Sequence, residues 1–184
     1  VLNIPNFAHG ALYAFGAYFT YMIAGLTDSF YLAILIAPFL VVLIGFLIES
    51  QGVRLLYAVH HDYQLLFLFA VALILQELII IIWGPVGFSL LPPDHLAGAV
   101  DLGIIIYPKY RIALLVFSAI VIIGLYLFVN KTDLGAILCA GIENREMVMV
   151  LGIDINRVFF LTFGLGAYLA GLAGGLSSAW PKIR

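Results

Sequence analysis

Residues 110–129 read YRIALLVFSAIVIIGLYLFV, and Arg111 is the only charged residue among them. The hydrocarbon core of a bilayer is about 30 Å thick and an α-helix rises about 1.5 Å per residue, so about 20 apolar residues are enough to cross it. A helix also pairs its own backbone N–H and C=O groups, which find no water in lipid. This stretch therefore predicts a transmembrane helix.

The same criterion selects four further apolar runs, each bounded by charged residues, Pro or Gly. They cover residues 7–25, 30–48, 65–83 and 158–178. Apolar residues make up 65% of the 184 residues and charged residues 10%, whereas soluble domains have about 45–50% and about 25%. A water-soluble fold is excluded. We predict an all-α fold, a polytopic transmembrane helical bundle with about five membrane-spanning helices.

Charge and cysteine content exclude other classes of protein. The formal net charge is −2 and the eight Lys and Arg residues are scattered, so no basic stripe is available to bind nucleic acid. The single cysteine, Cys139, rules out a disulfide or a thiolate metal site within the chain. The adjacent His60 and His61 would point about 100° apart on a helix. We interpret them as part of a solvated loop and expect no metal.

Five crossings assign the loops alternately to the two sides of the membrane. Loops 49–64 and 130–157 fall on one side, and loops 26–29 and 84–109 fall on the other with the C-terminal tail. Each side carries four Lys and Arg residues, so the positive-inside rule alone does not decide the orientation. With the tail set aside, the 130–157 side is favoured as cytoplasmic and 84–109 becomes an extracytoplasmic loop.

The two long loops differ in chemistry. Segment 84–109 is rich in Pro and Gly, which predicts an irregular loop. Segment 130–157 alternates charged and apolar residues without a Pro, which predicts short helices outside the membrane. Thr132 is a candidate N-cap for the first of them, and Gly141 and Gly152 are candidate stops.

Residues 144–153, NREMVMVLGI, would form a short helix with a polar start and exposed Met, Val and Leu. Apolar helices of this kind dock into grooves on partner proteins, and Met-rich surfaces adapt well to them. The alternative is a helix that lies on its own bundle or in the headgroup plane. Composition leaves both open.

Several motifs carry a resemblance to a known family. They are NIPNFAHG at 3–10, WGP at 83–85, KTDLG at 131–135, NRV at 156–158 and LTF at 161–163, followed by a Gly- and Ala-rich last helix. In this order they resemble the branched-chain amino acid (Liv-type) ABC-transporter permease family. Because the chain opens on Val1 in an apolar segment, we expect an internal fragment. Residues 1–184 would form a single transmembrane permease domain, incomplete at both ends.

The resemblance implies that 130–157 is a cytoplasmic coupling loop inserted into a groove on an ATPase. Glu146 and Gly152 match the Glu and Gly of the importers' E-A-A-x-x-x-G pattern, whereas Met147 and Val148 replace its alanines. A rigid helix tied to two membrane helices can turn ATPase closure into helix rocking. The expected ATPase-coupling residues are Asn144, Arg145, Glu146, Met147, Met149, Leu151 and Gly152.

The energy source would be another chain. No Lys follows a Gly, so the P-loop that cradles phosphates is missing. We expect a transport subunit and not an enzyme, with no cofactor of its own and with ATP and Mg²⁺ on partner ATPase subunits. The resemblance implies a second permease subunit, two cytoplasmic ABC ATPases, an extracytoplasmic substrate-binding protein and a bacterial-type inner membrane as surroundings.

Six polar or flexible positions are candidates for a substrate path or gate. Asn3, Asn6, His9 and Gly10 lie at the mouth of the first span, and Gln76 and Glu77 lie inside the third. Polar groups at membrane depth face a cavity or the bundle interior. The alternative is structural: the Asn and His side chains complete a helix start broken by Pro and Gly, and the carboxylate makes a hydrogen bond to a neighbouring helix.

In the last span, small residues recur at every fourth position, a spacing that lets helices approach closely in lipid. The predicted packing rows are Gly166, Ala170, Gly174 and Ala167, Gly171, Gly175.

The leading function is therefore an ABC-importer permease that moves branched-chain or related small amino acids by alternating access. An importer of urea or short amides within the same family is the alternative. A secondary transporter or a channel is the alternative from another class, and the sparse intramembrane charge argues against ion coupling.

Overall fold

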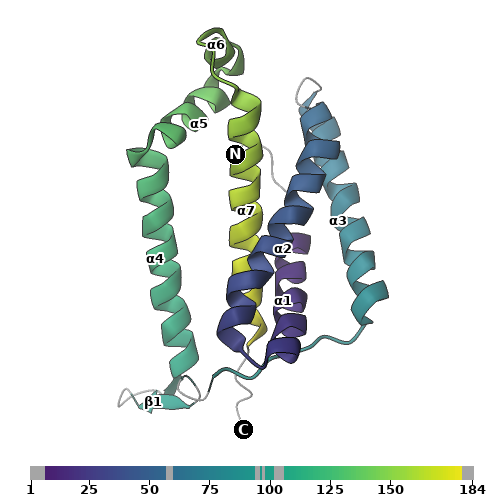
Figure 1. Cartoon of the computed structure of the whole chain (residues 1–184), viewed down its shortest axis with the longest axis vertical. Helices are drawn as coiled ribbons and strands as arrows, with labels where there is room; N and C mark the ends of the chain where they lie inside the picture. The colour runs from purple at the N-terminus through teal and green to yellow at the C-terminus, as the bar shows by residue number, and fades with distance from the viewer. Residues whose placement is uncertain (1–6, 57–59, 94–95, 97, 102–105, 180–184) are drawn as a thin grey trace.

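The computed structural model describes residues 7–56, 60–93, 96, 98–101 and 106–179 (Figure 1). Helices dominate this part of the chain. They are α1 (Ala8–Thr27), α2 (Phe30–Gln51), the 3₁₀ helix η1 (Val53–Leu56), α3 (His61–Trp83), α4 (Lys109–Lys131), α5 (Asp133–Glu143), α6 (Arg145–Val150) and α7 (Ile155–Ser178). The antiparallel strands β1 (Ala99–Asp101) and β2 (Ile106–Pro108) complete it. The predicted all-α bundle is confirmed.

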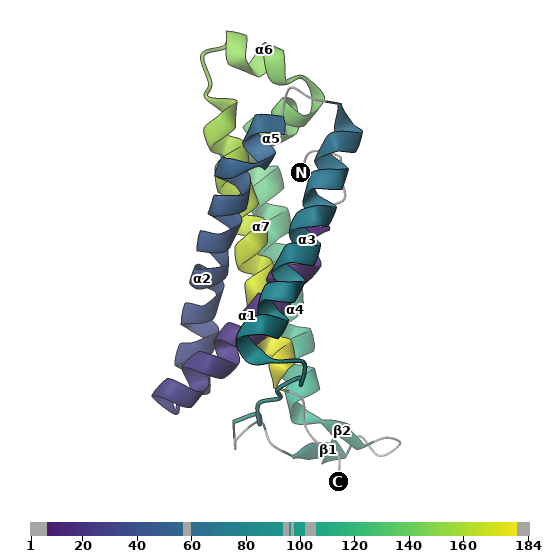
Figure 2. The same cartoon turned by 90° about the vertical axis from the view of Figure 1, so that its right-hand side faces the viewer.

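The long helices run between two ends of the molecule (Figures 1 and 2). One end carries the α1–α2 turn, the β1–β2 hairpin and the last residues of α7, and the other carries η1, α5 and α6. Helices α1, α2 and α7 pack together, and α3 lies against α1. Helix α4 stands apart in Figure 1, joined to the bundle mainly through α5. The loops are divided between the ends as the sequence predicts.

Four helical stretches within the described residues are long and apolar enough to cross a membrane, namely Phe30–Leu56, Asp62–Trp83, Lys109–Lys131 and Ile155–Ser178. The fifth predicted span, 7–25, is also a helix, the 20-residue α1. Its glycines, tyrosines, threonines and His9 keep it below the hydropathy of the other four. It nevertheless lies inside the bundle, between α2 and α7.

Several predicted boundaries are wrong. Loop 49–64 is much shorter than expected, because α2 continues to Gln51 and α3 already starts at His61. Segment 84–109 is not wholly irregular, since it contains the β1–β2 hairpin. The start of α7 lies at Ile155, where the Asp154 carboxylate accepts a hydrogen bond from the Arg157 N–H. Local caps and pairing thus extend elements beyond their apolar runs.

Small residues set the distances between the central helices. A Cβ added at Gly16 of α1 would lie 2.2 Å from the Gly171 carbonyl oxygen of α7. A Cβ added at Gly45 of α2 would lie 2.6 Å from the Ala167 Cβ. Dispersion contacts at such close approach are what hold helices together in lipid, where no hydrophobic force acts between them.

Candidate coupling surface and membrane polar residues

The α5–α6 segment is capped at each helix start. The Thr132 hydroxyl accepts a hydrogen bond from the Gly135 N–H at 3.1 Å, so the predicted N-cap is confirmed. The Asn144 side-chain oxygen accepts one from the Met147 N–H at 3.0 Å and starts α6. Gly152 follows α6 with φ at 79°, a conformation that favours glycine and that ends the helix as predicted.

Gly141 does not stop its helix, contrary to the prediction, because α5 continues to Glu143. It is buried, and a Cβ at this position would lie 2.3 Å from Ile155 Cδ1. The glycine therefore lets α5 lie close to the start of α7. Sequence alone does not distinguish a glycine that ends a helix from one that makes room for a neighbour.

Helix α6 has one buried residue and several exposed apolar ones. Val148 is 4% exposed and packs with Leu138, Ile155 and Phe159. The exposed fractions of the others are 60% for Met147, 44% for Met149, 82% for Val150 and 71% for Leu151. Neither α5 nor α7 covers these four side chains, and they form an apolar surface at one end of the molecule.

A polar contact fixes α6 to α7. The Arg145 guanidinium donates a hydrogen bond to the Asn156 side-chain oxygen at 2.6 Å. Arg145 is half-buried, whereas Asn144, Glu146 and Gly152 are exposed. Of the predicted coupling residues, Asn144 and Arg145 thus make bonds that hold α6 in place, and Glu146, Met147, Met149, Leu151 and Gly152 face outward.

The four predicted path residues that the structure describes lie exposed on two different helices. Asn3 and Asn6 lie outside the described residues. His9 and Gly10 are exposed on α1, which runs through Gly10 without the expected break. Gln76 and Glu77 are exposed on α3, whereas the neighbouring Leu75 and Ile79 make its packed face. Within the described ranges no hydrogen bond or ion pair joins the α1 pair to the α3 pair.

Some of the small residues of α7 lie against a neighbouring helix, and others face open space. Ala170, Gly171, Gly174 and Gly175 are buried. A Cβ at Gly174 would lie 1.8 Å from the Tyr13 carbonyl oxygen, and one at Gly175 would lie 2.4 Å from the Thr20 hydroxyl. Gly166 has nothing within 4 Å of an added Cβ. Of the predicted packing glycines, Gly171, Gly174 and Gly175 thus lie against a neighbouring helix, and Gly166 does not.

Glu49 is a residue that the hydropathy pattern missed. The apolar run of α2 stops at Ile48, yet the helix continues and the Glu49 side chain is fully buried, at 0% exposed. Gly45, one turn earlier, faces α7, and Val53, one turn later, packs with residues of α1 and α3. The carboxyl group therefore lies where four helices meet. The i+4 spacing of Val41, Gly45 and Glu49 is the signal that could have found it.

His60 pairs with an acidic side chain at the start of α3. His60 Nδ1 lies 3.2 Å from the Asp62 carboxylate, and both side chains are exposed. His60 precedes α3 and Asp62 lies in its first turn, so the predicted loop is the start of a helix. No group of three or more His, Cys, Asp or Glu side chains that could hold a metal occurs in the described part of the chain.

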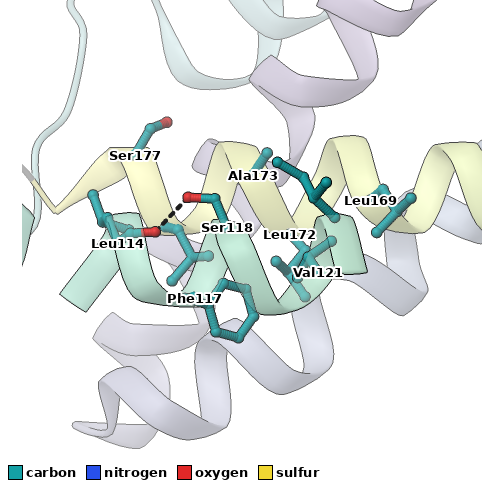
Figure 3. A pocket seen from close by; sticks show the side chains of 10 residues that line it. Leu114, Phe117, Ser118, Val121, Leu169, Leu172, Ala173 and Ser177 are labelled. Carbon is teal, nitrogen blue, oxygen red and sulfur yellow. Dashed lines mark hydrogen bonds between the residues drawn. The ribbon is translucent and has the colours of Figure 1, made fainter. Parts of the chain in front are cut away.

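A cavity lies between α4 and α7 (Figure 3). It measures about 390 Å³ and its lining is almost entirely apolar, with the hydroxyls of Ser118 and Ser177 as exceptions. Both hydroxyls donate to carbonyls of their own helices, at Leu114 and Gly174. An amino-acid substrate carries an ammonium and a carboxylate, and this lining offers neither of them a charged partner. The cavity suits an apolar group.

Comparison with known proteins agrees with these features. The profile of the family described as "Branched-chain amino acid transport system / permease component" matches residues 1–183. The high-affinity branched-chain amino acid transport system permease protein BraD of Pseudomonas aeruginosa is 27% identical over 188 residues, which cover 96% of this chain and 61% of the relative. The corresponding LivH protein of Salmonella typhimurium is 25% identical over 192 residues, with the same coverage.

A probable branched-chain amino acid transport permease protein LivH of Methanocaldococcus jannaschii is 38% identical over 64 residues, 35% of this chain and 20% of that protein. No solved structure matches. The chain spans 61% of the length of BraD and of the Salmonella typhimurium LivH protein. The resemblance found in the motifs is confirmed, and the chain belongs to the family of branched-chain amino acid transport system permease components.

Proposed function

We propose that the full-length protein is the membrane-spanning permease subunit of an ATP-driven ABC importer for branched-chain or related small amino acids. The family match over residues 1–183 and the names of the relatives support this role. ATP and Mg²⁺ would be bound by two separate cytoplasmic ATPases. A second permease subunit and an extracytoplasmic binding protein would complete the assembly, in a bacterial-type inner membrane.

The observation that carries the mechanism is the surface of α6. Val148 and the Arg145–Asn156 bond hold this helix firmly, while four apolar side chains remain exposed. In water such a surface favours burial against a partner. An ATPase groove that receives α6 would push on α5 and α7 together, because α6 is continuous with both. In this proposal segment 130–157 is the cytoplasmic coupling loop and 84–109 faces outward.

Alternating access follows from this connection. Closure of the ATPase dimer would move α6 as a rigid piece, and α7 would carry the movement to α1 and α2 through its glycine contacts. Packed helix interfaces switch between discrete arrangements and do not deform continuously. The substrate path would then open alternately at its two ends.

The test is uptake of labelled leucine by the full-length permease, reconstituted with its partner subunits. We predict that uptake requires ATP and the ATPase chains. We further predict that Glu146→Ala or Gly152→Pro uncouples the complex, so that ATP is still hydrolysed but leucine uptake no longer depends on it. Each substitution changes α6 or its end, which transmit the movement. Binding of leucine and urea to the detergent-solubilised complex, measured side by side, identifies the substrate class.

Two results would contradict the proposal. Uptake that persists without any ATPase would indicate a secondary transporter or a channel. Normal coupled uptake in both variants would show that α6 does not transmit the movement.

A further inference from the structure

A second surface at the α6 end has a different chemistry. A pocket of about 280 Å³ is lined by Arg54, Asp154, Asn156, Arg157 and Phe160. Arg54 belongs to η1, between α2 and α3, and the other four come from the N-cap and first turns of α7. Two segments that are far apart in the sequence, η1 and the start of α7, thus line one polar pocket.

The charges of this pocket are unequal. Asp154 is already engaged, since its Oδ2 lies 2.9 Å from Arg157 Nε. Arg54 is exposed, and within the described residues it has no hydrogen-bond or ion-pair partner. Two guanidinium groups against one carboxylate leave a charge of +1 in the lining. The pocket therefore favours an anionic group.

The wall of the pocket is rigid. The Phe160 ring stacks on Phe46 of α2, with ring centroids 4.1 Å apart and an interplanar angle of 11°. Asn156 is held by the hydrogen bond from Arg145 of α6. A guanidinium beside a fixed aromatic wall can bind a carboxylate with two parallel hydrogen bonds.

We propose that this pocket receives an acidic side chain, Asp or Glu, of the ATPase subunit that also binds α6. The inference rests on the proposed function. Asn156 lines the pocket and also bonds to α6, so an ATPase that covers α6 lies directly beside the pocket. Figure 2 shows α6 as the outermost element of this end, with the start of α7 just beneath it. The ATPase would thereby contact the α2–α3 connection as well as α6.

Arg54 would provide a second contact between the permease and the ATPase, in addition to α6. A single short helix in a groove can pivot, whereas an ion pair to a different loop fixes the angle between permease and ATPase. Ion pairs at the rim of an interface act mainly on association rate and salt dependence. The contribution of Arg54 should therefore decrease as ionic strength rises.

The experiment uses the full-length permease complex and measures the binding of purified ATPase across a salt series. Arg54→Glu should weaken ATPase binding about tenfold at low salt and flatten its salt dependence. Arg54→Lys keeps the positive charge but loses the two parallel hydrogen bonds of the guanidinium, so it should weaken ATPase binding about twofold to threefold. Lys109→Glu is the matched control, because Lys109 is an exposed cation at the opposite end of the molecule, on α4, and its substitution changes the net charge equally. It should bind ATPase as the wild type does.

Suppressor selection supplies a second readout. In cells with Arg54→Glu, ATPase mutations that restore uptake should change an Asp or Glu to Lys or Arg. Suppressors that all lie elsewhere would overturn the assignment. Melting of each purified variant in detergent verifies that the fold is unchanged, as expected for an exposed residue.

Three outcomes are distinguishable. If the wild type and the Arg54→Glu variant bind the ATPase equally well, this inference is overturned and the proposed function is not. Absence of ATPase binding by the wild type overturns it together with the proposed function. If Arg54→Glu binds ATPase normally but loses uptake only in vesicles that contain phosphatidylglycerol, the pocket binds a lipid phosphate and the inference is wrong.

Discussion

Gly174 lies where the backbone of α7 comes close to that of α1. An added Cβ would be 1.8 Å from the Tyr13 carbonyl oxygen, a backbone atom that cannot move aside alone. We predict that Gly174→Ala lowers the free energy of unfolding by about 1–3 kcal/mol or more, because the helices must separate. Denaturant unfolding of the purified full-length protein in detergent measures it.

Gly166 is the matched control, because an added Cβ there meets nothing within 4 Å. Gly166→Ala should leave stability unchanged or raise it by up to about 1 kcal/mol, since alanine favours the helix. Equal effects of the two substitutions would mean that α1 and α7 do not pack as described.

Glu49 tests whether a buried carboxyl group holds the junction of α1, α2, α3 and α7. The side chain has 0% exposure and is engaged in an interaction. Glu49→Ala should destabilise the protein by about 1–3 kcal/mol, because the interaction of a fully buried side chain is lost. Glu49→Gln should lose less, because the amide keeps the length and one oxygen. The exposed Glu146→Ala serves as the reference, with a change within about 0.5 kcal/mol.

The sequence predicted the packing role of the α7 glycines but not the burial of Glu49, and the difference has a physical reason. The glycine rows of α7 are visible because helix packing in lipid needs small residues at i+4 spacing. The same rule does not say which glycine meets a neighbour, and Gly166 proved open. Glu49 was placed in a loop because a carboxylate normally ends an apolar run. Three other helices bury it, and in the sequence only its i+4 spacing from Val41 and Gly45 indicates this burial.

Among the elements, α6 makes the sharpest prediction. Val150→Asp places a charge on a side chain that is 82% exposed, so stability should change by no more than about 0.5 kcal/mol. ATPase binding should nevertheless be strongly reduced, because a carboxylate in an apolar groove loses its hydration. Val148→Asp is the counterpart, since Val148 is 4% exposed and its substitution should destabilise the fold itself.

Co-purification of the ATPase with the full-length permease, alongside thermal melting of each variant, separates the two effects. Normal ATPase retention by Val150→Asp would show that the apolar surface of α6 faces lipid or its own bundle.

Helices and caps were predictable from the sequence where a single physical requirement decides them. Hydropathy located every long helix to within a few residues, because lipid demands continuous apolar runs. It missed the β1–β2 hairpin, which depends on pairing between two short segments. It also missed the separation of α4 from the bundle, since an apolar helix reads the same whether protein or lipid covers it. Caps such as Thr132 were visible because their hydrogen bonds are local.

For the whole molecule, the division into two ends is the feature on which function depends. The α6 surface and the Arg54 pocket lie at one end, and the β1–β2 hairpin lies at the other. The open side of α7 toward α4 is largely apolar and offers no charged partner to an amino acid. The chain covers 61% of the length of its relatives.

The most direct test of the account places a photo-reactive amino acid at Val150 of α6 in the full-length permease within its complex. A matched variant carries it at Val86, which is 69% exposed in the segment that follows α3 at the opposite end. We predict light-dependent adducts with the ATPase from Val150 and none from Val86. Adducts with the ATPase from Val86, or only with lipid from Val150, would contradict the claim that α6 is the point at which the ATPase drives this permease.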